Sequence, residues 1–362
     1  MRAGALRAEA DTSQEPVNSP FFSVIIPLYN KEPYITRALD SVSKQKYTDY
    51  EIIVVDDVST DNGLCVAESH LKVSEHRYTI VRRQQRGGSC APARATGCRY
   101  ARGKYFAFLD ADDEWNERFL AEIHSLIETF PEAEAYATNR ELVIDGKVKK
   151  GPYQPRVGDS KPHIIDLEAF LDSRRESGNP FRVQGMAFRP EALDDIGGFV
   201  HAPRSSDIDL MFRFFLRGKR AAWSPYCGLR IHRVPDSTMA HTELQFTRPW
   251  FYSVVEAIDR GVLPRRIVRK LREDIWRQKH ADLCKAASLR RLSLSYWSTI
   301  SLPPVRFTSL FLVIITVLPV LQSSVGCYQR IVRLSSVLGK KLKHILRQRK
   351  TPRVASTRNT DQ

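Results

Sequence analysis

The chain has 362 residues, of which 42% are apolar and 27% charged, a composition typical of a globular protein with one large domain or two smaller ones. Its six cysteines form no CxxC pair, which argues against a disulfide framework or a zinc site and favours a reducing compartment. The net charge of +15 is concentrated in residues 260–362, which hold 22 Lys and Arg against 4 Asp and Glu. This asymmetry predicts a near-neutral body and a basic tail that binds a polyanion.

The first hundred residues alternate short apolar runs with helical patterns. Residues 1–20 lack the apolar core of a signal peptide and are predicted to form a flexible arm. Strands are predicted at 22–27, 51–55, 78–81 and 105–109, with helices at 33–44, after a cap within 59–61, and at 92–101. This order predicts a parallel sheet covered by helices on both faces.

Carboxylates follow two of these strands. Asp110, Asp112 and Asp113 come directly after the apolar run that ends at Leu109, and Asp57 follows the strand 51–55. Because ligands bind at the carboxyl ends of parallel strands, both groups are predicted to face one crevice. Three crowded carboxylates also predict a site for a hard divalent cation. The alternative is a solvated turn that caps the next helix, since DxD is a short pattern.

The middle of the chain gives further elements. A helix is predicted from Trp115 to Pro131, with Trp115, Phe119 and Ile123 on its apolar side. Residues 145–162 are predicted to form a mobile loop. A strand at 183–188, a turn at 197–199 and a helix at 207–216, capped by Ser205-Ser206 and closed by Gly218, complete this part.

The C-terminal part is basic and amphipathic. A long helix is predicted at 263–289, and residues 307–329 follow with no charged residue, near the length that spans a bilayer. Residues 330–350 are again basic, which suits an anionic membrane surface. A buried hairpin is the alternative for 307–329. We expect no nucleic-acid partner, because the tail lacks the aromatic interleaving of single-strand binders.

Several stretches together resemble the family 2 glycosyltransferases of GT-A fold over about residues 21–240. They are SVIIPLYN from Ser23, EIIVVDDVSTD from Glu51, GGSCAPARATGCRYARGKYFAFLDADDEW from Gly87, GMAFRPEALDDIGGF from Gly185, SSDIDLMFRF from Ser205 and IHRVPDSTM from Ile231. The resemblance implies a Rossmann-like, mixed and mostly parallel sheet flanked by helices, with a helical basic C-terminal extension. Together with the composition of the two ends of the chain, it predicts an arm (1–20), a GT-A domain (21–245) and a membrane-associated region (246–362).

The resemblance also implies residue roles. The donor-binding residues would be Pro27, Tyr29, Asp57, Arg94 and Asp110, with Asp57 at the nucleotide base, Arg94 near the diphosphate and Asp110 at the ribose or sugar. Asp112 would ligate Mn²⁺ or Mg²⁺, which stabilises the leaving diphosphate. His232 would assist at the diphosphate or metal. Asp207, in the first turn of its helix, would be the general base.

Two positions depart from the family pattern. Ser206 stands where the family often has Glu before the base, and Ala95 stands where Asn usually follows the arginine. Gln245 to Trp250 is a chance likeness to the QxxRW of processive members, because Pro249 is inserted. The two departures are compatible with an altered donor specificity or a reduced activity, and the lack of a true QxxRW motif predicts transfer of a single sugar.

The function expected from the resemblance is metal-dependent, inverting transfer of one sugar from a nucleotide-sugar donor. The donor is expected to be a UDP-sugar, and the acceptor a hydroxyl of a glycan or a lipid-linked molecule. The expected location is the cytoplasmic face of the inner membrane, either peripheral or anchored by the C-terminal region. The alternative is a non-catalytic membrane-associated protein with a decayed glycosyltransferase fold, in which Ser206 marks the loss.

Overall fold

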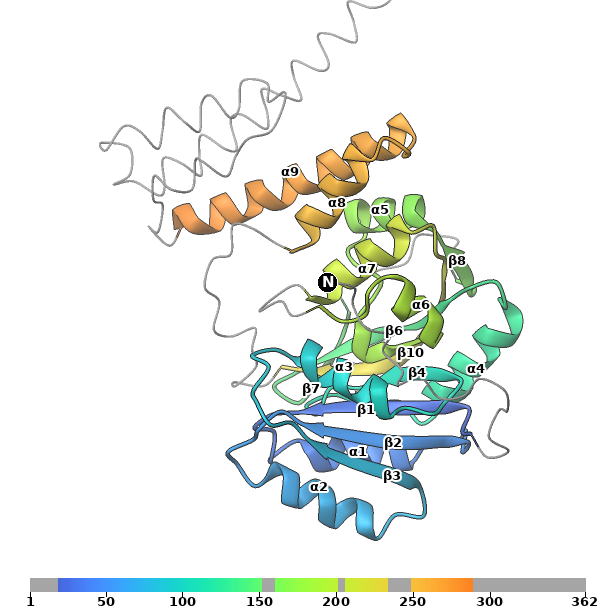
Figure 1. Cartoon of the computed structure of the whole chain (residues 1–362), viewed down its shortest axis with the longest axis vertical. Coiled ribbons are helices and arrows are strands. Elements are labelled where there is room, and N and C mark those ends of the chain that lie inside the picture. Colours follow the sequence, from blue (N-terminus) through green and yellow to red (C-terminus); the bar gives the residue numbers. More distant parts are fainter. Residues whose placement is uncertain (1–18, 152–159, 201–205, 234–248, 289–362) are drawn as a thin grey trace, which may run out of the picture. The chain divides into compact units, whose positions relative to one another are not determined.

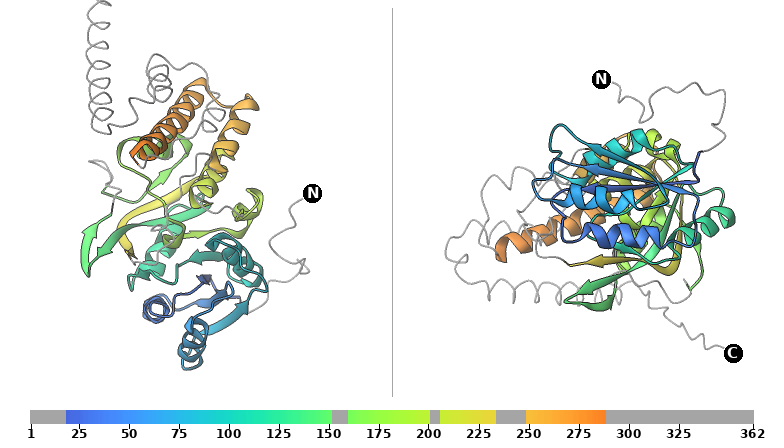
Figure 2. Two further views of the ribbon diagram at one scale, coloured as in Figure 1. Left: turned by 90° about the vertical axis from the view of Figure 1, so that its left-hand side faces the viewer. Right: turned by 90° about the horizontal axis from the view of Figure 1, so that it is seen from below.

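The computed structural model describes residues 19–151, 160–200, 206–233 and 249–288 (Figures 1 and 2). The chain divides into two compact units, of which the first is Met1–Glu243 with Thr247–Trp276. The second is Leu244–Phe246 with Arg277–Gln362. The predicted boundary at 245 and the stretch 307–329 lie outside the described residues. Within the described part, no helix is long and apolar enough to cross a membrane.

The N-terminal half of the sheet is parallel, as predicted. Its elements in chain order are β1 (Phe22–Leu28), α1 (Ile35–Ser43), β2 (Tyr50–Asp56), α2 (Gly63–Lys72), β3 (Arg77–Arg82), α3 (Cys90–Tyr100) and β4 (Tyr105–Phe108). The strands lie in the order β3-β2-β1-β4, and every pair is parallel. All residues of β1 and β2 are buried, because both faces of these strands are covered.

The sheet continues as a mixed half. Its strands are β5 (Glu114–Trp115), β6 (Ala135–Ile144), β7 (Lys147–Lys150), β8 (His163–Ile165), β9 (Met186–Phe188) and β10 (Ala221–His232). β9 runs antiparallel to both β4 and β6, whereas β6 and β10 pair in parallel. In the described part of the chain, the whole sheet is therefore mixed, with the order β3-β2-β1-β4-β9-β6-β10-β5.

Helices pack on both faces of the parallel half. Val24, Ile26 and Leu28 belong to one buried core with residues of α1, α2 and α4 (Phe119–Thr129). On the other face, α3 approaches the sheet so closely that a Cβ on Gly97 would lie 2.4 Å from Ile25 Cγ2. Glycine at this position allows α3 to lie close to the strand ends.

The helix predicted from Trp115 begins later than expected. Glu114–Trp115 forms β5 and pairs antiparallel with β10, and α4 begins only at Phe119. The Trp115 indole stacks on the Phe119 ring with centroids 4.1 Å apart, and its Nε1 donates to the Gln184 carbonyl at 2.8 Å. The helical spacing of these two aromatic residues therefore indicated a contact but assigned Trp115 to the wrong element.

The loop predicted for 145–162 is wrong in its first part. Residues 147–150 form β7, which makes an antiparallel hairpin with β6. Asp145 and Gly146 connect the two strands with φ values of 51° and 72°, the left-handed conformations that a tight hairpin turn requires. Residues 152–159 lie outside the described chain. The strand predicted at 183–188 is shorter than expected, since its first three residues form a 3₁₀ turn before β9.

The remaining helices flank the mixed half. They are α5 (Leu167–Glu176), α6 (Pro190–Asp195), α7 (Ser206–Leu216), α8 (Pro249–Asp259) and α9 (Arg265–Ser288). The predicted helix at 207–216 is confirmed, and Gly218 follows it with a φ of 76°. On α9 the predicted apolar residues Ile267, Leu271 and Ile275 are buried.

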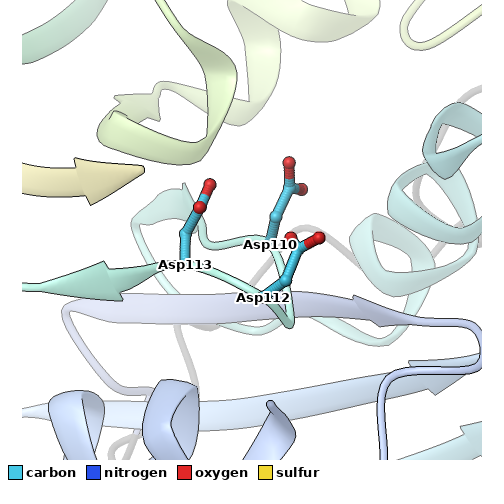
Figure 3. Close-up of side chains that lie close together, drawn as sticks. All are labelled: Asp110, Asp112 and Asp113. Atoms are coloured by element: carbon cyan, nitrogen blue, oxygen red, sulfur yellow. The ribbon is translucent and has the colours of Figure 1, made fainter. Parts of the chain in front are cut away.

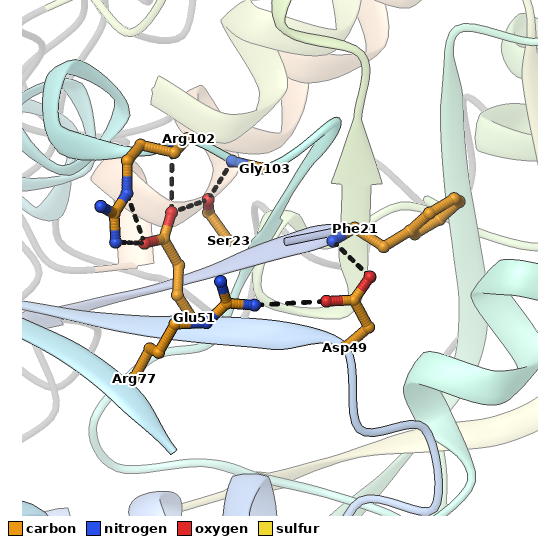
Figure 4. A network of polar contacts seen from close by, with 7 residues as sticks. All are labelled: Phe21, Ser23, Asp49, Glu51, Arg77, Arg102 and Gly103. Atoms are coloured by element: carbon orange, nitrogen blue, oxygen red, sulfur yellow. Dashed lines mark hydrogen bonds and ion pairs between the residues drawn. The ribbon is translucent and has the colours of Figure 1, made fainter. Parts of the chain in front are cut away.

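A buried carboxylate joins the strand ends opposite the acidic loop. Glu51 on β2 accepts a hydrogen bond from Ser23 Oγ at 2.7 Å, and from the Arg102 backbone and guanidinium at 2.8 and 2.9 Å (Figure 4). Ser23 Oγ in turn accepts from the Gly103 amide at 2.8 Å. Nearby, Asp49 contacts the exposed Arg77 at 3.4 Å. Glu51 thereby ties β1 and β2 to the segment that leads into β4.

We expect Glu51→Ala to lower the free energy of unfolding by about 2–4 kcal/mol, because the Ser23 hydroxyl and the Arg102 amide lose their acceptor. Urea denaturation would measure the change. Arg77→Ala is the control from the same network and should change stability by less than about 0.5 kcal/mol, since its ion pair is exposed. Equal effects of the two substitutions would contradict the role of Glu51.

Candidate active site

Three carboxylates meet in the loop that follows β4. One oxygen each of Asp110, Asp112 and Asp113 lies within 4.8 Å of the other two. Their side chains extend to the same side of the loop (Figure 3). The Asp113 amide donates to the Asp110 carbonyl at 3.1 Å, which closes the turn that brings the three residues together. The structure thus forms the cluster that the sequence predicted at the end of this strand.

Each carboxylate has different partners. Asp110 contacts a buried guanidinium, and Asp112 Oδ2 lies 2.7 Å from Lys31 Nζ. Asp113 is buried and accepts hydrogen bonds from the His232 amide at 2.9 Å and from Gln184 Nε2 at 3.2 Å. Burial raises the pKa of Asp113 well above its usual range, and the charges of Asp112 and Asp110 raise it further.

The guanidinium of Arg94 joins two distant parts of the chain. Its Nη2 donates to Asp110 at 2.6 Å, and its Nη1 donates to Asp207 at 2.8 Å. Asp207 is 113 positions from Arg94 in the sequence. The Arg94 side chain is fully buried, whereas both carboxylates are 24% exposed. Burial alone would lower the pKa of Arg94, but the two carboxylates and Cys90 raise it, so the residue stays charged.

The pKa of Asp110 is subject to opposing effects. Burial raises its pKa, and the adjacent Arg94 charge opposes that rise, while Asp112 and Asp207 add to it. The Arg94 bridge therefore gathers Asp110, after β4, and Asp207, on α7, around one cation. The sequence placed Arg94 near a diphosphate, and in the structure its two terminal nitrogens are engaged by carboxylates.

The carboxylate of Asp57 lies in a separate cradle at the end of β2. Its oxygens accept the Gly87 amide at 3.0 and 2.9 Å, and Arg83 Nη1 contacts Oδ1. A Cβ at position 87 would lie 2.5 Å from Arg83 Nη1, so glycine permits this approach. In the loop after β1, the Tyr29 ring lies 4.1 Å from the Arg86 guanidinium carbon.

Pro27 and Asp57 lie at the carboxyl ends of adjacent strands. Pro27 is buried within β1, where it pairs with Val55 of β2, and the Asp57 amide donates to the Leu28 carbonyl at 2.8 Å. The predicted nucleotide-base residues, Pro27, Tyr29 and Asp57, therefore come from two neighbouring strand ends. That Asp57 and Asp110 face one crevice stays a prediction.

Helix α7 presents its two aspartates differently. Asp207, in the first turn, is partly exposed and forms an ion pair with Arg94. Asp209 is buried, accepts a hydrogen bond from Arg213 at 2.8 Å and accepts another from Ser253 of α8 at 2.9 Å. Asp209 thus holds α7 against α8, while Asp207 remains beside the acidic loop.

His232, at the end of β10, touches the site chiefly through its backbone. Its amide binds Asp113, and its Nε2 lies 3.2 Å from Glu114 Oε1. Burial lowers the pKa of His232, Arg37 lowers it further and Glu114 opposes the change. The imidazole therefore faces Glu114, next to the acidic cluster.

Four site residues were not found from the sequence. They are Lys31, Arg37, Arg83 and Gln184, of which Arg37 Nη2 donates to the backbone carbonyl of Asp112. Lys31 and Arg37 lie shortly after β1. Because ligands bind at the carboxyl ends of parallel strands, their position in the sequence could have indicated that they lie near the site. Gln184 gave no signal, because its contact depends on the pairing of β9 with β4.

The arrangement suits a divalent cation and a group that accepts a proton. Clustered carboxylate oxygens are the donors that Mg²⁺ and Mn²⁺ prefer, so the acidic loop fits such an ion. A carboxylate in the first turn of a helix is stabilised in its ionised form and can accept a proton. The fixed arginine keeps Asp207 and the acidic loop in one place.

The chain is similar in sequence to known glycosyltransferases. Residues 23–197 match the sequence model described as Glycosyl transferase family 2. The Escherichia coli protein UDP-Glc:alpha-D-GlcNAc-diphosphoundecaprenol beta-1,3-glucosyltransferase WfgD is 40% identical over 93 residues, covering 26% of this chain and 35% of the relative. The Staphylococcus aureus (strain Mu50) poly(ribitol-phosphate) beta-N-acetylglucosaminyltransferase TarS is 36% identical over 109 residues, covering 30% and 19%. The chain spans well under half the length of the curated relatives it matches.

Two solved structures share the fold. That of S. aureus TarS 1-349 in complex with UDP-GlcNAc aligns with a TM-score of 0.57 and 18% identity, covering 76% of each chain. That of the mannosyltransferase PcManGT from Pyrobaculum calidifontis, in complex with GDP-Man and Mn²⁺, aligns with a TM-score of 0.50 and 20% identity, covering 85% of each chain. These likenesses show a GT-A-like α/β fold for the described sheet and its helices.

We expect Asp113→Asn to raise the free energy of unfolding at pH 7 by about 1–2 kcal/mol in metal-free buffer. The raised pKa of Asp113 means that its contribution to stability is present at acid pH and is lost as pH rises through the folded-state value. The asparagine avoids that loss, and Gln184 can turn its free Oε1 toward the new amide. Urea denaturation from pH 4 to 8 should show a gain that disappears at the acid end.

Asp110→Asn makes the same change of charge and serves as the matched comparison. It should lower stability at pH 7, because the buried Arg94 would lose one of its two carboxylates. An equal gain from both variants would show that general repulsion in the loop, and not the different partners of the two residues, controls stability.

Proposed function

We propose that the protein is a family 2 glycosyltransferase, because residues 23–197 match the model of that family. In this proposal it transfers a single sugar from a UDP-sugar to a hydroxyl, with inversion and with a divalent metal. The acceptor is a glycan or a lipid-linked molecule. The observation that carries the proposal is the Arg94 bridge, at 2.6 and 2.8 Å, between Asp110 of the donor loop and Asp207 of α7. It puts the proposed donor site and the proposed base on opposite sides of one buried cation.

The donor nucleotide would bind across the ends of β1 and β2. Asp57 would accept a hydrogen bond from the base, with Pro27 and Tyr29 beside it, and Arg94 and Asp110 would lie toward the diphosphate and sugar. A uridine donor is supported by the relatives, since TarS has been solved with UDP-GlcNAc and WfgD is named as a UDP-Glc enzyme. In this chain, Arg83 and the Gly87 amide hold the Asp57 carboxylate in position for that contact.

Mn²⁺ or Mg²⁺ would be held by Asp112, with Asp110 and Asp113 close enough to contribute oxygens. The related PcManGT structure contains Mn²⁺. The bound ion would supply positive charge that stabilises the leaving diphosphate. His232 would act at this site mainly by fixing Asp113 through its amide, because its imidazole faces Glu114.

Asp207 would remove the proton from the attacking hydroxyl. It lies in the first turn of α7, and its 24% exposure leaves it accessible to a substrate hydroxyl. Direct attack by the activated hydroxyl on the sugar displaces the diphosphate in one step and inverts the anomeric centre. Ser206, at the position where the family often has Glu, leaves Arg94 as the charged partner of the base in this structure.

We expect calorimetry to detect binding of UDP in the presence of Mn²⁺, with weak or no binding of UDP alone and of GDP. Asp207→Asn should bind UDP and Mn²⁺ within about threefold of the native protein, because it preserves the shape of the side chain. The variant should release UDP from UDP-glucose or UDP-GlcNAc about 10²–10⁴ times more slowly, since water, like the acceptor, needs a base.

Full activity of Asp207→Asn would sink its assignment as the base. A folded native protein that bound neither nucleotide under any of these conditions would instead favour the non-catalytic alternative. The two results are separable, because the first measures turnover and the second measures binding alone.

The protein would work at the cytoplasmic face of the inner membrane. In support, the basic composition of residues 260–362 suits an anionic surface, and α9 presents Arg265, Arg269 and Arg272 as exposed residues at helical spacing. Arg266 and Lys270, on the side toward α5, pair with Glu168 at 2.9 Å each. Among the described residues, no such ion pair engages the three exposed arginines, and Trp276, 40% exposed, continues their stripe.

We expect the triple variant R265Q/R269Q/R272Q to bind phosphatidylserine-containing liposomes about a hundredfold more weakly at 0.1 M salt, since each arginine near an anionic surface contributes about 1 kcal/mol. Cosedimentation would measure the affinity. The control K147Q/K149Q/K150Q removes the same charge from the exposed strand β7. An equal loss in the control, or a native protein that ignores the liposomes, would contradict membrane docking through α9.

A further inference from the structure

The proposed metal ligand Asp112 already has a cation of its own. Lys31 Nζ lies 2.7 Å from Asp112 Oδ2, and the two side chains are only 15% and 20% exposed. Lys31 comes from the loop after β1, whereas Asp112 follows β4, so the contact joins two segments of the site. An ammonium group in contact with this oxygen repels a divalent cation that approaches the same atom.

Lys31 differs from the other groups that contact the acidic loop. Arg94 is fully buried and bound by two carboxylates, so it has no room to leave. Arg37 contacts the Asp112 backbone carbonyl and leaves the carboxylate to Lys31. A lysine has a flexible stem and a compact charge, which allow its ammonium to move while the backbone stays in place.

The backbone that carries Lys31 is well anchored. Asn30, with a φ of 47°, accepts a hydrogen bond from the Thr60 amide at 2.8 Å, and its own amide donates to Ser59 Oγ at 3.2 Å. The ring of Tyr34, the residue directly before α1, has its centroid 5.6 Å from Lys31 Nζ. The anchored loop keeps the side chain within reach of the acidic cluster, and the stem permits a change of partner.

We infer that Lys31 is an exchangeable counter-ion that neutralises Asp112 until a divalent metal and a nucleotide diphosphate arrive together. The inference rests on the proposed function. When a metal ion binds Asp112, the Lys31 ammonium is displaced from that carboxylate. The diphosphate that binds with the metal is then the anion available to the ammonium. Binding of the metal alone is therefore weak, and binding of the pair is favoured, because only the pair provides a new partner for Lys31.

The test is calorimetric titration of Mn²⁺ into the full chain, with and without UDP. Lys31→Met should bind Mn²⁺ alone about ten to a hundred times more tightly than the native protein, because the competing charge is gone. The increase in Mn²⁺ affinity that UDP produces should shrink by at least about tenfold. Lys31→Gln is a second neutral variant that can be used if Lys31→Met folds poorly. Lys31→Arg should keep the weak Mn²⁺ binding of the native protein.

Two controls separate the possible failures. Lys46→Met removes a lysine whose exposed side chain pairs with Glu117, away from Asp112, and should leave Mn²⁺ binding unchanged. Asp112→Asn should abolish Mn²⁺ binding in the presence of UDP. If it does so while both neutral Lys31 variants bind Mn²⁺ like the native protein, the counter-ion inference is overturned and the metal site stands. If Asp112→Asn binds Mn²⁺ and UDP normally, the proposed metal site itself fails.

Discussion

The buried guanidinium of Arg94 is the interaction on which the rest of the site depends. A fully buried charge is stable only when it is paired, and Arg94 is paired with carboxylates from two parts of the fold, Asp110 and Asp207. The close packing of α3 on β1, which requires glycine at position 97, sets the place from which Arg94 reaches both. The packing of α3 on β1 therefore determines both how the buried charge of Arg94 is paired and how Asp110 and Asp207 are placed.

At the carboxyl edge of the sheet, three carboxylates each contact a different cationic side chain. Arg83 contacts Asp57, Arg94 contacts Asp110 and Lys31 contacts Asp112. Asp113 differs, because only neutral hydrogen-bond donors face it, and its pKa rises accordingly. This division distinguishes residues whose charge is fixed by the fold from a residue, Asp112, whose cation can be exchanged.

The sequence predicted the parallel half of the sheet well and the mixed half poorly. Runs such as that of β1 are apolar throughout because both faces are buried, and such runs are visible without any partner. β10 was not predicted, since its pattern is interrupted by Pro225 and Gly228, where its register with β6 shifts. Trp115 was assigned to a helix because its spacing to Phe119 is compatible with one, and pairing with β10 decided otherwise.

The residues of the site were predictable where they follow predictable elements and were missed where they depend on long-range contacts. Asp57, Asp110 and Asp112 could be found because they follow predictable strands, and Asp207 because it opens a predictable helix. The ion pair between Arg94 and Asp207 spans 113 positions and could not be found from local pattern. The role of Gln184 depends on strand pairing in the mixed half, which the pattern did not reveal.

The contact between Asp113 and residue 232 is made by a backbone amide, as is one contact between Asp57 and residue 87. Every residue type except proline offers that amide, so the imidazole of His232 can be replaced during divergence while the donor to Asp113 persists. Two enzymes with this architecture can therefore differ at position 232 and still hold the third carboxylate in the same place. The residue type at such a position says little about its structural role, because that role depends on the backbone conformation.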